Sequence, residues 1–172
     1  MTHRIKTRLF APLLASILVP TLAATSVLAA PMVARAAVSK ANCQMHAVLL
    51  SKDGDGTIPK ELEFLRTTFE TDEFAAYKGF FLLERKTAKL ALDTKAETAF
   101  KSGHRLGLTL RGGTEKRLKL HADLSSRDGS KALLSTGYEI DDAGVLMISA
   151  GSYSDEKRSG KAFFAISCSA AK

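Results

Sequence analysis

Strict alternation of apolar and polar residues dominates the second half of the chain. Leucine or alanine occupies every second position over 106–110 and again over 118–124, on either side of Gly112-Gly113. Period-two alternation is typical of half-buried strands, and two such runs flanking a Gly-Gly pair indicate a hairpin. The pattern predicts an antiparallel meander of five strands in all. Beyond the first two, its strands are expected over 132–140, 145–150 and 162–168.

The pattern before residue 100 is more varied. Residues 44–50 predict one short strand. Over 58–69, apolar residues recur at spacings of four, three and four, which predicts an amphipathic helix of about three turns. Thr57 is the expected N-cap, and Pro59 fits the first turn because its missing N–H would have no helical partner there. An aromatic-rich segment opens a further strand over 77–92, which is expected to be buried on both faces.

These elements together predict a mainly β protein. The expected architecture is an antiparallel β-sandwich or partly open barrel of seven to eight strands, with one short amphipathic helix near the N-terminus. The helix is expected to cover one edge or end of the strands.

The chain has two cysteines, Cys43 in the first predicted strand and Cys168 in the last. They are not in a Cys-x-x-Cys arrangement, and neither has a lysine or histidine as a sequence neighbour, which argues against a redox pair. In an oxidising compartment they are expected to form a disulfide. Such a bond requires the first and last strands to lie side by side or to face each other across the core.

The N-terminal segment has the layout of a signal peptide. Three of the first eight residues are basic and none is acidic, and an apolar run follows over 9–30. Cleavage after Ala36 fits better than cleavage after Ala29, which gives a signal peptide over 1–36 and one domain over 37–172. The alternative is an uncleaved anchor, because the apolar run approaches the length that spans a bilayer. With the signal removed, we expect an exported domain, periplasmic or secreted, without membrane insertion.

The basic character of the chain belongs mostly to this segment. Four of the 25 basic residues and none of the 18 acidic residues lie within 1–36, so the net charge falls from +7 for the whole chain to +3 for the rest. The remaining charges are interspersed along the sequence. Neither observation favours a nucleic acid as partner.

One short motif suggests metal binding. Residues 53–58, Asp-Gly-Asp-Gly-Thr-Ile, resemble the calcium loop of an EF-hand of the calmodulin type. The resemblance implies that Asp53 and Asp55 offer carboxylates as the third and fifth loop residues. However, Ser51 stands at the first ligand position, and Leu62 replaces the bidentate glutamate at the twelfth. These departures favour a polar turn, for which Asp and Gly are the usual residues.

The sequence evidence for a catalytic site is weaker than the evidence for a calcium site. His121 and Asp123 stand two apart on one predicted strand and therefore share a face with Lys119. The sequence contains no Gly-x-Ser-x-Gly motif, so it names no nucleophile beside them. The expected role of this face is exposure to solvent. His46 and His104 show no metal-ligand spacing with each other or with the cysteines.

The longest polar connection between predicted strands runs from 151 to 160. It carries Tyr153, Asp155, Lys157 and Arg158, which could form a partner-binding loop on a rigid sandwich. The alternative is a solvated hairpin loop.

These observations lead to three hypotheses about function. The first is an exported, non-enzymatic β-sandwich module, without a cofactor, that binds another envelope or extracellular component, a protein or other partner of unknown identity. The second is a calcium-stabilised extracellular module that uses the Asp53/Asp55 turn. The third is a small secreted hydrolase or inhibitor, for which only His121 and Asp123 are available.

Overall fold

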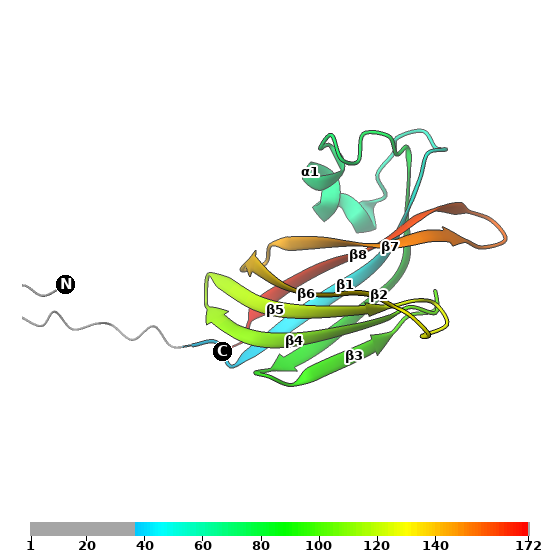
Figure 1. The fold of residues 1–172 in the computed structure, drawn as a ribbon. Helices are drawn as coiled ribbons and strands as arrows, with labels where there is room; N and C mark the ends of the chain where they lie inside the picture. Colours follow the sequence, from blue (N-terminus) through cyan, green and yellow to red (C-terminus); the bar gives the residue numbers. More distant parts are fainter. Residues whose placement is uncertain (1–36, 172) are drawn as a thin grey trace, which may run out of the picture. The chain divides into compact units, whose positions relative to one another are not determined.

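A computed structural model describes residues 37–171, and the predicted signal peptide lies outside this range. Within it, the chain forms eight strands and one short helical segment between the first two strands (Figure 1). The elements are β1 (Lys40–Ser51), the 3₁₀ turn η1 (Lys60–Leu65), α1 (Arg66–Phe69), β2 (Gly79–Ala91), β3 (Lys95–Ala99), β4 (Arg105–Thr114), β5 (Arg117–Ser125), β6 (Ala132–Asp141), β7 (Val145–Ser154) and β8 (Ser159–Ala170).

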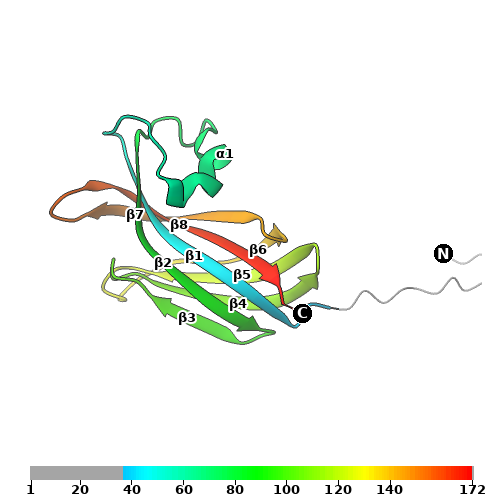
Figure 2. The ribbon, with the colours of Figure 1, turned by 180° about the vertical axis from the view of Figure 1, so that it is seen from behind.

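The strands form two antiparallel sheets of four. The first sheet has the order β2-β1-β8-β7, and the second has the order β3-β4-β5-β6 (Figures 1 and 2). Successive strands therefore follow one another around the two layers, and the pairing of β1 with β8 joins the two ends of the series. This arrangement confirms the predicted mainly β, antiparallel sandwich.

The predicted five-strand meander is wrong in one respect, because the chain changes sheet after β6. The turn over 142–144 carries it from an edge of the second sheet to an edge of the first. Three hydrogen bonds to β8 hold this turn. The Ala143 N–H donates to the Cys168 carbonyl at 3.0 Å, the Asp142 carboxylate accepts from the Ala170 N–H at 3.1 Å, and the Ala143 carbonyl accepts from the Ser167 hydroxyl at 3.1 Å. Alternation along a strand shows which residues face the core, and it does not show which sheet the strand joins.

Two further details of the strands differ from the prediction. Gly112 and Gly113 lie inside β4, where the register with β5 shifts, and the turn itself is at Glu115 and Lys116. Both glycines have positive φ, and a side chain at Gly113 would collide with the Arg117 carbonyl, so the pair forms a bulge next to the turn. The short strand β3 was not predicted, because its sequence, Lys-Ala-Glu-Thr-Ala, has no large apolar residue.

Strand β2 was predicted over 77–92 and is present over Gly79–Ala91. The expectation that it is buried on both faces is wrong, because most of its residues after Phe80 are partly buried or exposed. Phe80 is buried, whereas Arg85, Thr87 and Lys89 are exposed on alternate positions. The apolar start of β2 packs under the helical segment, and the remainder leaves that cover.

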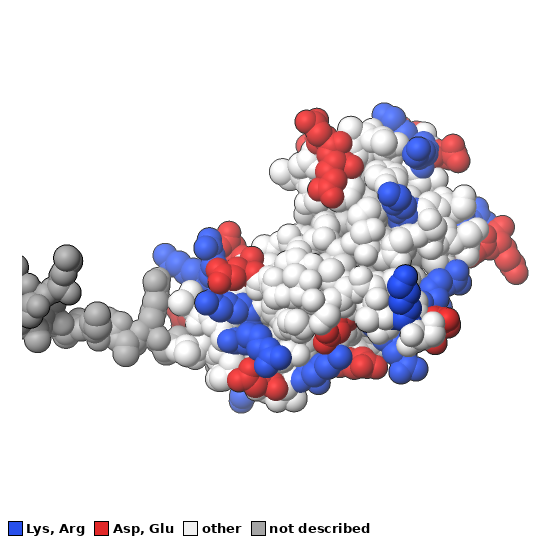
Figure 3. All heavy atoms as spheres, in the orientation of Figure 1, with Lys and Arg blue, Asp and Glu red and all other residues white. Residues whose placement is uncertain are grey.

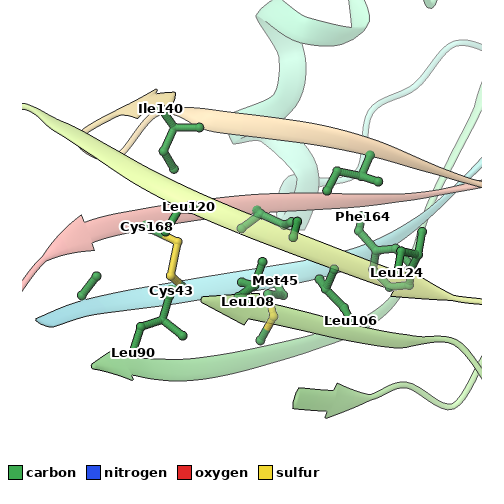
Figure 4. Packing of buried hydrophobic residues seen from close by; sticks show 14 of the residues in the cluster. Cys43, Met45, Leu90, Leu106, Leu108, Leu120, Leu124, Ile140, Phe164 and Cys168 are labelled. Carbon is green, nitrogen blue, oxygen red and sulfur yellow. A yellow bond between two sulfur atoms is a disulfide. The ribbon is translucent and has the colours of Figure 1, made fainter. Parts of the chain in front are cut away.

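The main hydrophobic core lies between the sheets. It contains large side chains that are almost completely buried, such as Met45 from β1, Leu108 from β4, Leu120 from β5 and Phe164 from β8 (Figure 4). These side chains come from the alternating apolar positions of both sheets. They pack against one another in the space between the two layers.

The helical segment covers part of the outer face of the first sheet (Figure 2). Leu62, Leu65 and Phe69 are buried there, as the spacing predicted. The segment begins after Pro59 rather than at an N-cap Thr57, and most of it is a 3₁₀ turn rather than an α-helix. A spacing of three residues between Leu62 and Leu65 suits 3.0 residues per turn, which aligns both leucines toward the sheet. The segment follows the first strand and so is not near the N-terminus of the chain.

Beneath the segment lies a second apolar cluster. Its buried members are Val48, Leu50, Leu62, Leu65, Phe69, Phe74, Phe80, Phe163 and Ala165. The aromatic rings account for the aromatic-rich sequence at 74–81: Phe69 stacks on Phe80 at 4.6 Å between ring centroids, and Phe74 meets Phe163 edge-on at 5.5 Å. These rings act in packing.

Cys43 and Cys168 form the predicted disulfide. They occupy directly opposite positions on β1 and β8, and both are buried in the main core (Figure 4). Two arrangements of the first and last strands were predicted, and the structure has the one in which they lie side by side in one sheet. The bond spans a sequence separation of 125 residues.

We expect replacement of both Cys43 and Cys168 by alanine to lower the free energy of unfolding by up to about 4 to 5 kcal/mol, because a crosslink over so long a loop restricts the unfolded chain. The cross-strand pairing of β1 and β8 would remain, so the far-ultraviolet circular dichroism should be retained. Urea denaturation of residues 37–172 measures the difference, with the reduced wild-type domain as control. An unchanged midpoint would show that strand pairing alone closes the series.

Candidate functional site

A groove of about 700 Å³ lies on the outer face of the first sheet, beside the helical segment. Figure 3 shows the segment standing above the sheets, with a recess in the outline below it. Ala143 and Val145 line the groove on its β7 side, and the rest of its floor consists of polar side chains from three neighbouring strands. These are Asn42 and Gln44 of β1, Thr87 of β2, and Ser167 and Ser169 of β8.

Strand register brings these side chains together. Thr87 is opposite Gln44, and Gln44 is opposite Ser167, so the three form one row across the sheet. Because successive side chains of a strand point to opposite faces, the alternate positions of each strand meet on this face while the cysteines face the core. Predicting this row requires the register between the strands. The sequence does not give that register directly, so the row was not predicted.

Two cations stand on the β2 side of the groove. Arg85 is opposite His46 in the register, and Lys89 is opposite Asn42. Both side chains line the groove, and neither forms an ion pair with any acidic side chain within residues 37–171. The β2 side of the groove is therefore positively charged. An acidic residue, Glu61, lines the groove from the helical segment.

His46 lines the inner part of the groove and is 5% exposed. Its ring lies 4.6 Å, between centroids, from the ring of Phe64, which is 45% exposed on the helical segment. The His46 Nδ1 is buried and has no hydrogen-bond partner among the described residues. Burial and the neighbouring Arg85 charge both lower the pKa of His46, which keeps the ring neutral near pH 7.

An unpartnered polar atom in a buried position is unfavourable. Leaving such a group unsatisfied costs about 1 to 3 kcal/mol, and native proteins contain few of them. The unsatisfied Nδ1 lies at the boundary between the apolar cluster under the helical segment and the polar floor. Sequence analysis could not detect it, because His46 stands in an otherwise ordinary strand.

His104 is the second buried histidine of the described residues. Its Nδ1 lies 3.1 Å from the Ser102 hydroxyl. Its ring meets Phe164 edge-on at 5.8 Å. Burial, followed by the charge of Arg127, lowers the pKa of His104. These contacts make His104 a packed core side chain with its own partner.

The Asp53/Asp55 turn is tightly hydrogen-bonded. The Asp55 carboxylate accepts the Thr57 N–H at 2.8 Å, which lowers the pKa of Asp55, and the Asp53 N–H donates to the Ser51 hydroxyl at 3.2 Å. The backbone pairs with Lys78, whose carbonyl accepts from Gly56. Within the described range, no group of three or more His, Cys, Asp or Glu side chains is arranged to hold a metal ion. Calcium binding by Asp53 and Asp55 stays a prediction.

The predicted partner-binding loop is shorter than expected. β7 extends to Ser154 and β8 begins at Ser159, so the connection consists of residues 155–158. The Asp155 carboxylate accepts the N–H groups of Lys157 and Arg158 at 2.9 and 2.8 Å, and these bonds lower the pKa of Asp155.

Two other side chains of this hairpin contact neighbouring parts of the fold. The Arg158 guanidinium lies 5.4 Å from the ring centroid of Phe81, and Tyr153 lies 5.2 Å below the Arg127 guanidinium. Lys157 is exposed at the tip. The four residues proposed as a binding loop are thus brought together, with Asp155, Arg158 and Tyr153 engaged in internal contacts. A recognition role for the hairpin stays a prediction.

His121 and Asp123 share the outer face of the second sheet, as predicted, and the structure adds Ser135 from β6. The Ser135 hydroxyl donates to the Asp123 carboxylate at 2.7 Å and lies 3.1 Å from the His121 Nε2. That same Nε2 is 3.3 Å from Asp123. In a catalytic triad the aspartate binds the ring nitrogen that faces away from the serine. The geometry therefore differs from that of a triad.

The group belongs instead to a network of surface charges. Lys95 pairs with Asp123 at 3.0 Å, and the hydrogen bond from Ser135, followed by Lys95, lowers the pKa of Asp123. On the face shown in Figure 3, basic and acidic side chains are interspersed. This arrangement agrees with a solvent-exposed surface.

Comparison with protein-family models, with curated proteins and with solved structures found no match. Within residues 37–171, none of the helices has the length and apolar character needed to cross a membrane.

The two buried histidines make stability depend on pH. Because the pKa values of His46 and His104 are lowered in the folded state, the unfolded chain binds more protons below about pH 6.5. We expect the free energy of unfolding to be greatest above this pH and to fall as the pH decreases to 5.5, with a slope of at most about 1.4 kcal/mol per pH unit for each histidine.

Urea denaturation at intervals between pH 7.5 and 5.5 measures this slope. His46→Gln combined with His104→Gln should flatten it. A wild-type stability that stays constant or rises toward pH 5.5 would contradict the assignment.

The Asp53/Asp55 turn makes a second prediction. Because Asp53 and Asp55 belong to no group of three or more metal-ligating side chains within residues 37–171, we expect thermal melts of residues 37–172 in excess EDTA and in millimolar calcium to coincide. A site filled at 100 times its dissociation constant would instead add about 2.7 kcal/mol. A rise of several degrees that disappears in Asp53→Ala with Asp55→Ala would establish the calcium site and overturn this expectation.

Proposed function

We propose that residues 37–172 form an exported, non-enzymatic module that binds another envelope or extracellular component in the groove on the first sheet. The observation that carries the proposal is the combination of groups in this groove. Arg85 and Lys89 have no acidic partner in the described part of the chain, and they stand beside a floor of polar side chains from β1, β2 and β8.

The second sheet provides a contrast. Its exposed cations are matched with acids across the strands, so that their charges are locally neutralised. The pairs are Lys95–Asp123, Arg105–Glu97, Arg111–Asp93, Arg117–Asp141 and Lys119–Glu139. A groove whose cations lack such partners within the described residues is suited to receive groups from another molecule.

The disulfide supports export, since such bonds persist in oxidising compartments. The signal peptide that would direct export remains a prediction from the sequence. A non-enzymatic role is supported by the arrangement of Ser135, His121 and Asp123, whose geometry does not suit nucleophilic catalysis.

The proposal is tested by reversing the charge of the groove. Residues 37–172 contain the hydrophobic core and the disulfide, so this domain can be used on its own. It is immobilised and exposed to envelope and culture-supernatant fractions of the source organism. Arg85→Glu with Lys89→Glu should reduce the bound protein and carbohydrate about tenfold or more, because each lost charge-assisted contact contributes about 1.5 to 3 kcal/mol.

The control is Lys157→Glu with Lys161→Glu, which makes the same charge change at the β7–β8 hairpin and should retain binding. Loss in the control alone would move the binding surface to the hairpin. If the wild-type domain retains nothing from either fraction, the binding function itself is contradicted.

A further inference from the structure

The chemistry of the groove indicates the class of its ligand. The positive charge is spread along β2 rather than gathered at one point. Arg85 and Lys89 are four residues apart on the same strand, which separates their backbones by about 13 Å. A ligand with anionic groups distributed along its length suits this spacing better than a single small anion. Arginine and lysine both pair with carboxylates through charge-assisted hydrogen bonds.

The floor between these cations and β8 is polar and uncharged. Hydroxyl groups of threonine and serine and amide groups of asparagine and glutamine can each donate and accept hydrogen bonds. Such groups match a ligand rich in hydroxyls, since each ligand hydroxyl also donates and accepts. The floor side chains are Asn42, Gln44, Thr87, Ser167 and Ser169, of which Ser167 already donates its hydroxyl hydrogen to the Ala143 carbonyl at 3.1 Å and so serves as an acceptor.

Phe64 adds an apolar surface at one wall. Its ring is 45% exposed, whereas six other phenylalanine rings of residues 37–171 are buried in the two cores and Phe81 is partly buried. An exposed aromatic ring beside hydrogen-bonding groups offers one apolar contact and several polar ones to the same ligand. Glu61, on the same segment, can accept hydrogen bonds from hydroxyls and repels carboxylates, which favours an orientation with the ligand's anionic groups toward β2.

A peptide fits the groove less well. Extended peptides usually gain affinity by pairing their backbone with an exposed sheet edge. The floor here is the face of a sheet, and β1 and β8 are already hydrogen-bonded on both sides. A peptide laid on this face would receive side-chain contacts only.

We propose that the groove binds a carboxylate-bearing carbohydrate, such as a chain of uronic acids. This inference rests on the proposed function and specifies its ligand. Arg85 and Lys89 would contact the carboxylates, the floor would bind the ring hydroxyls, and Phe64 would pack against an apolar face of a sugar ring.

An immobilised oligosaccharide panel tests the ligand class. The panel contains tetramers of galacturonate, mannuronate and guluronate, hyaluronan and sialylated oligosaccharides, with neutral galactotetraose, cellotetraose and chitotetraose as matched controls. Tetraglutamate peptide and a phosphorylated sugar represent other carboxylate and anionic sources. Binding of residues 37–172 is measured at physiological salt. We expect binding to one or more of the carboxylate-bearing oligosaccharides and at least about tenfold weaker binding to neutral ones.

Variants connect that binding to the groove. Arg85→Gln and Lys89→Gln should each weaken it about tenfold, and Phe64→Ala should weaken binding to the same oligosaccharide. Lys157→Gln at the hairpin is the control and should not change it. All four replaced side chains are exposed, and circular dichroism with a thermal melt shows whether each variant is folded.

The outcomes separate this proposal from the function on which it rests. If no acidic oligosaccharide binds, if neutral ones bind equally well, or if tetraglutamate or the phosphorylated sugar binds more tightly, the carbohydrate assignment is wrong. The binding function still stands in that case when Arg85→Glu with Lys89→Glu abolishes capture from the envelope or supernatant fractions. Failure of both experiments contradicts both proposals.

Discussion

The pairing of β1 with both β2 and β8 is the interaction on which the rest of the fold depends. β1 pairs with β2 along its whole length, and with β8 over Ala41–Leu50. Its pairing with β8 joins the first strand to the last, and the disulfide between Cys43 and Cys168 links the same two strands covalently. Its inward side chains, such as Met45, enter the main core, whereas Val48 and Leu50 enter the cluster under the helical segment. One strand thus connects both apolar clusters and both ends of the domain.

The groove follows from a change in composition along these strands. At one end, outward side chains of β1, β2 and β8 are apolar, and the short helical segment covers them. Toward the other end, the same face becomes polar, and ten residues of helical structure are too short to reach over it. His46 stands at the boundary, partly enclosed by Phe64. Its unsatisfied Nδ1, within the described residues, is a consequence of standing between an apolar cover and an open polar face.

Local patterns in the sequence predicted those features that depend on neighbouring residues. Alternation over 118–124 identified β5 and its core side, and the spacing of Leu62, Leu65 and Phe69 identified the buried face of the helical segment. The disulfide followed from the positions of the two cysteines. The groove, the change of sheet after β6 and the approach of Ser135 to Asp123 depend on register between strands, and no local pattern encodes register directly.

The location of the candidate site also has a physical reason. Loops are the usual place for recognition, yet Asp155, Arg158 and Tyr153 of the β7–β8 hairpin form contacts within the domain. Breaking these contacts to engage a partner would offset part of the energy gained. Arg85 and Lys89 incur no such loss, because no acid in residues 37–171 pairs with them. They also extend from a strand whose backbone is held by its neighbour β1, so the backbone positions that carry these side chains have a fixed spacing before any ligand arrives.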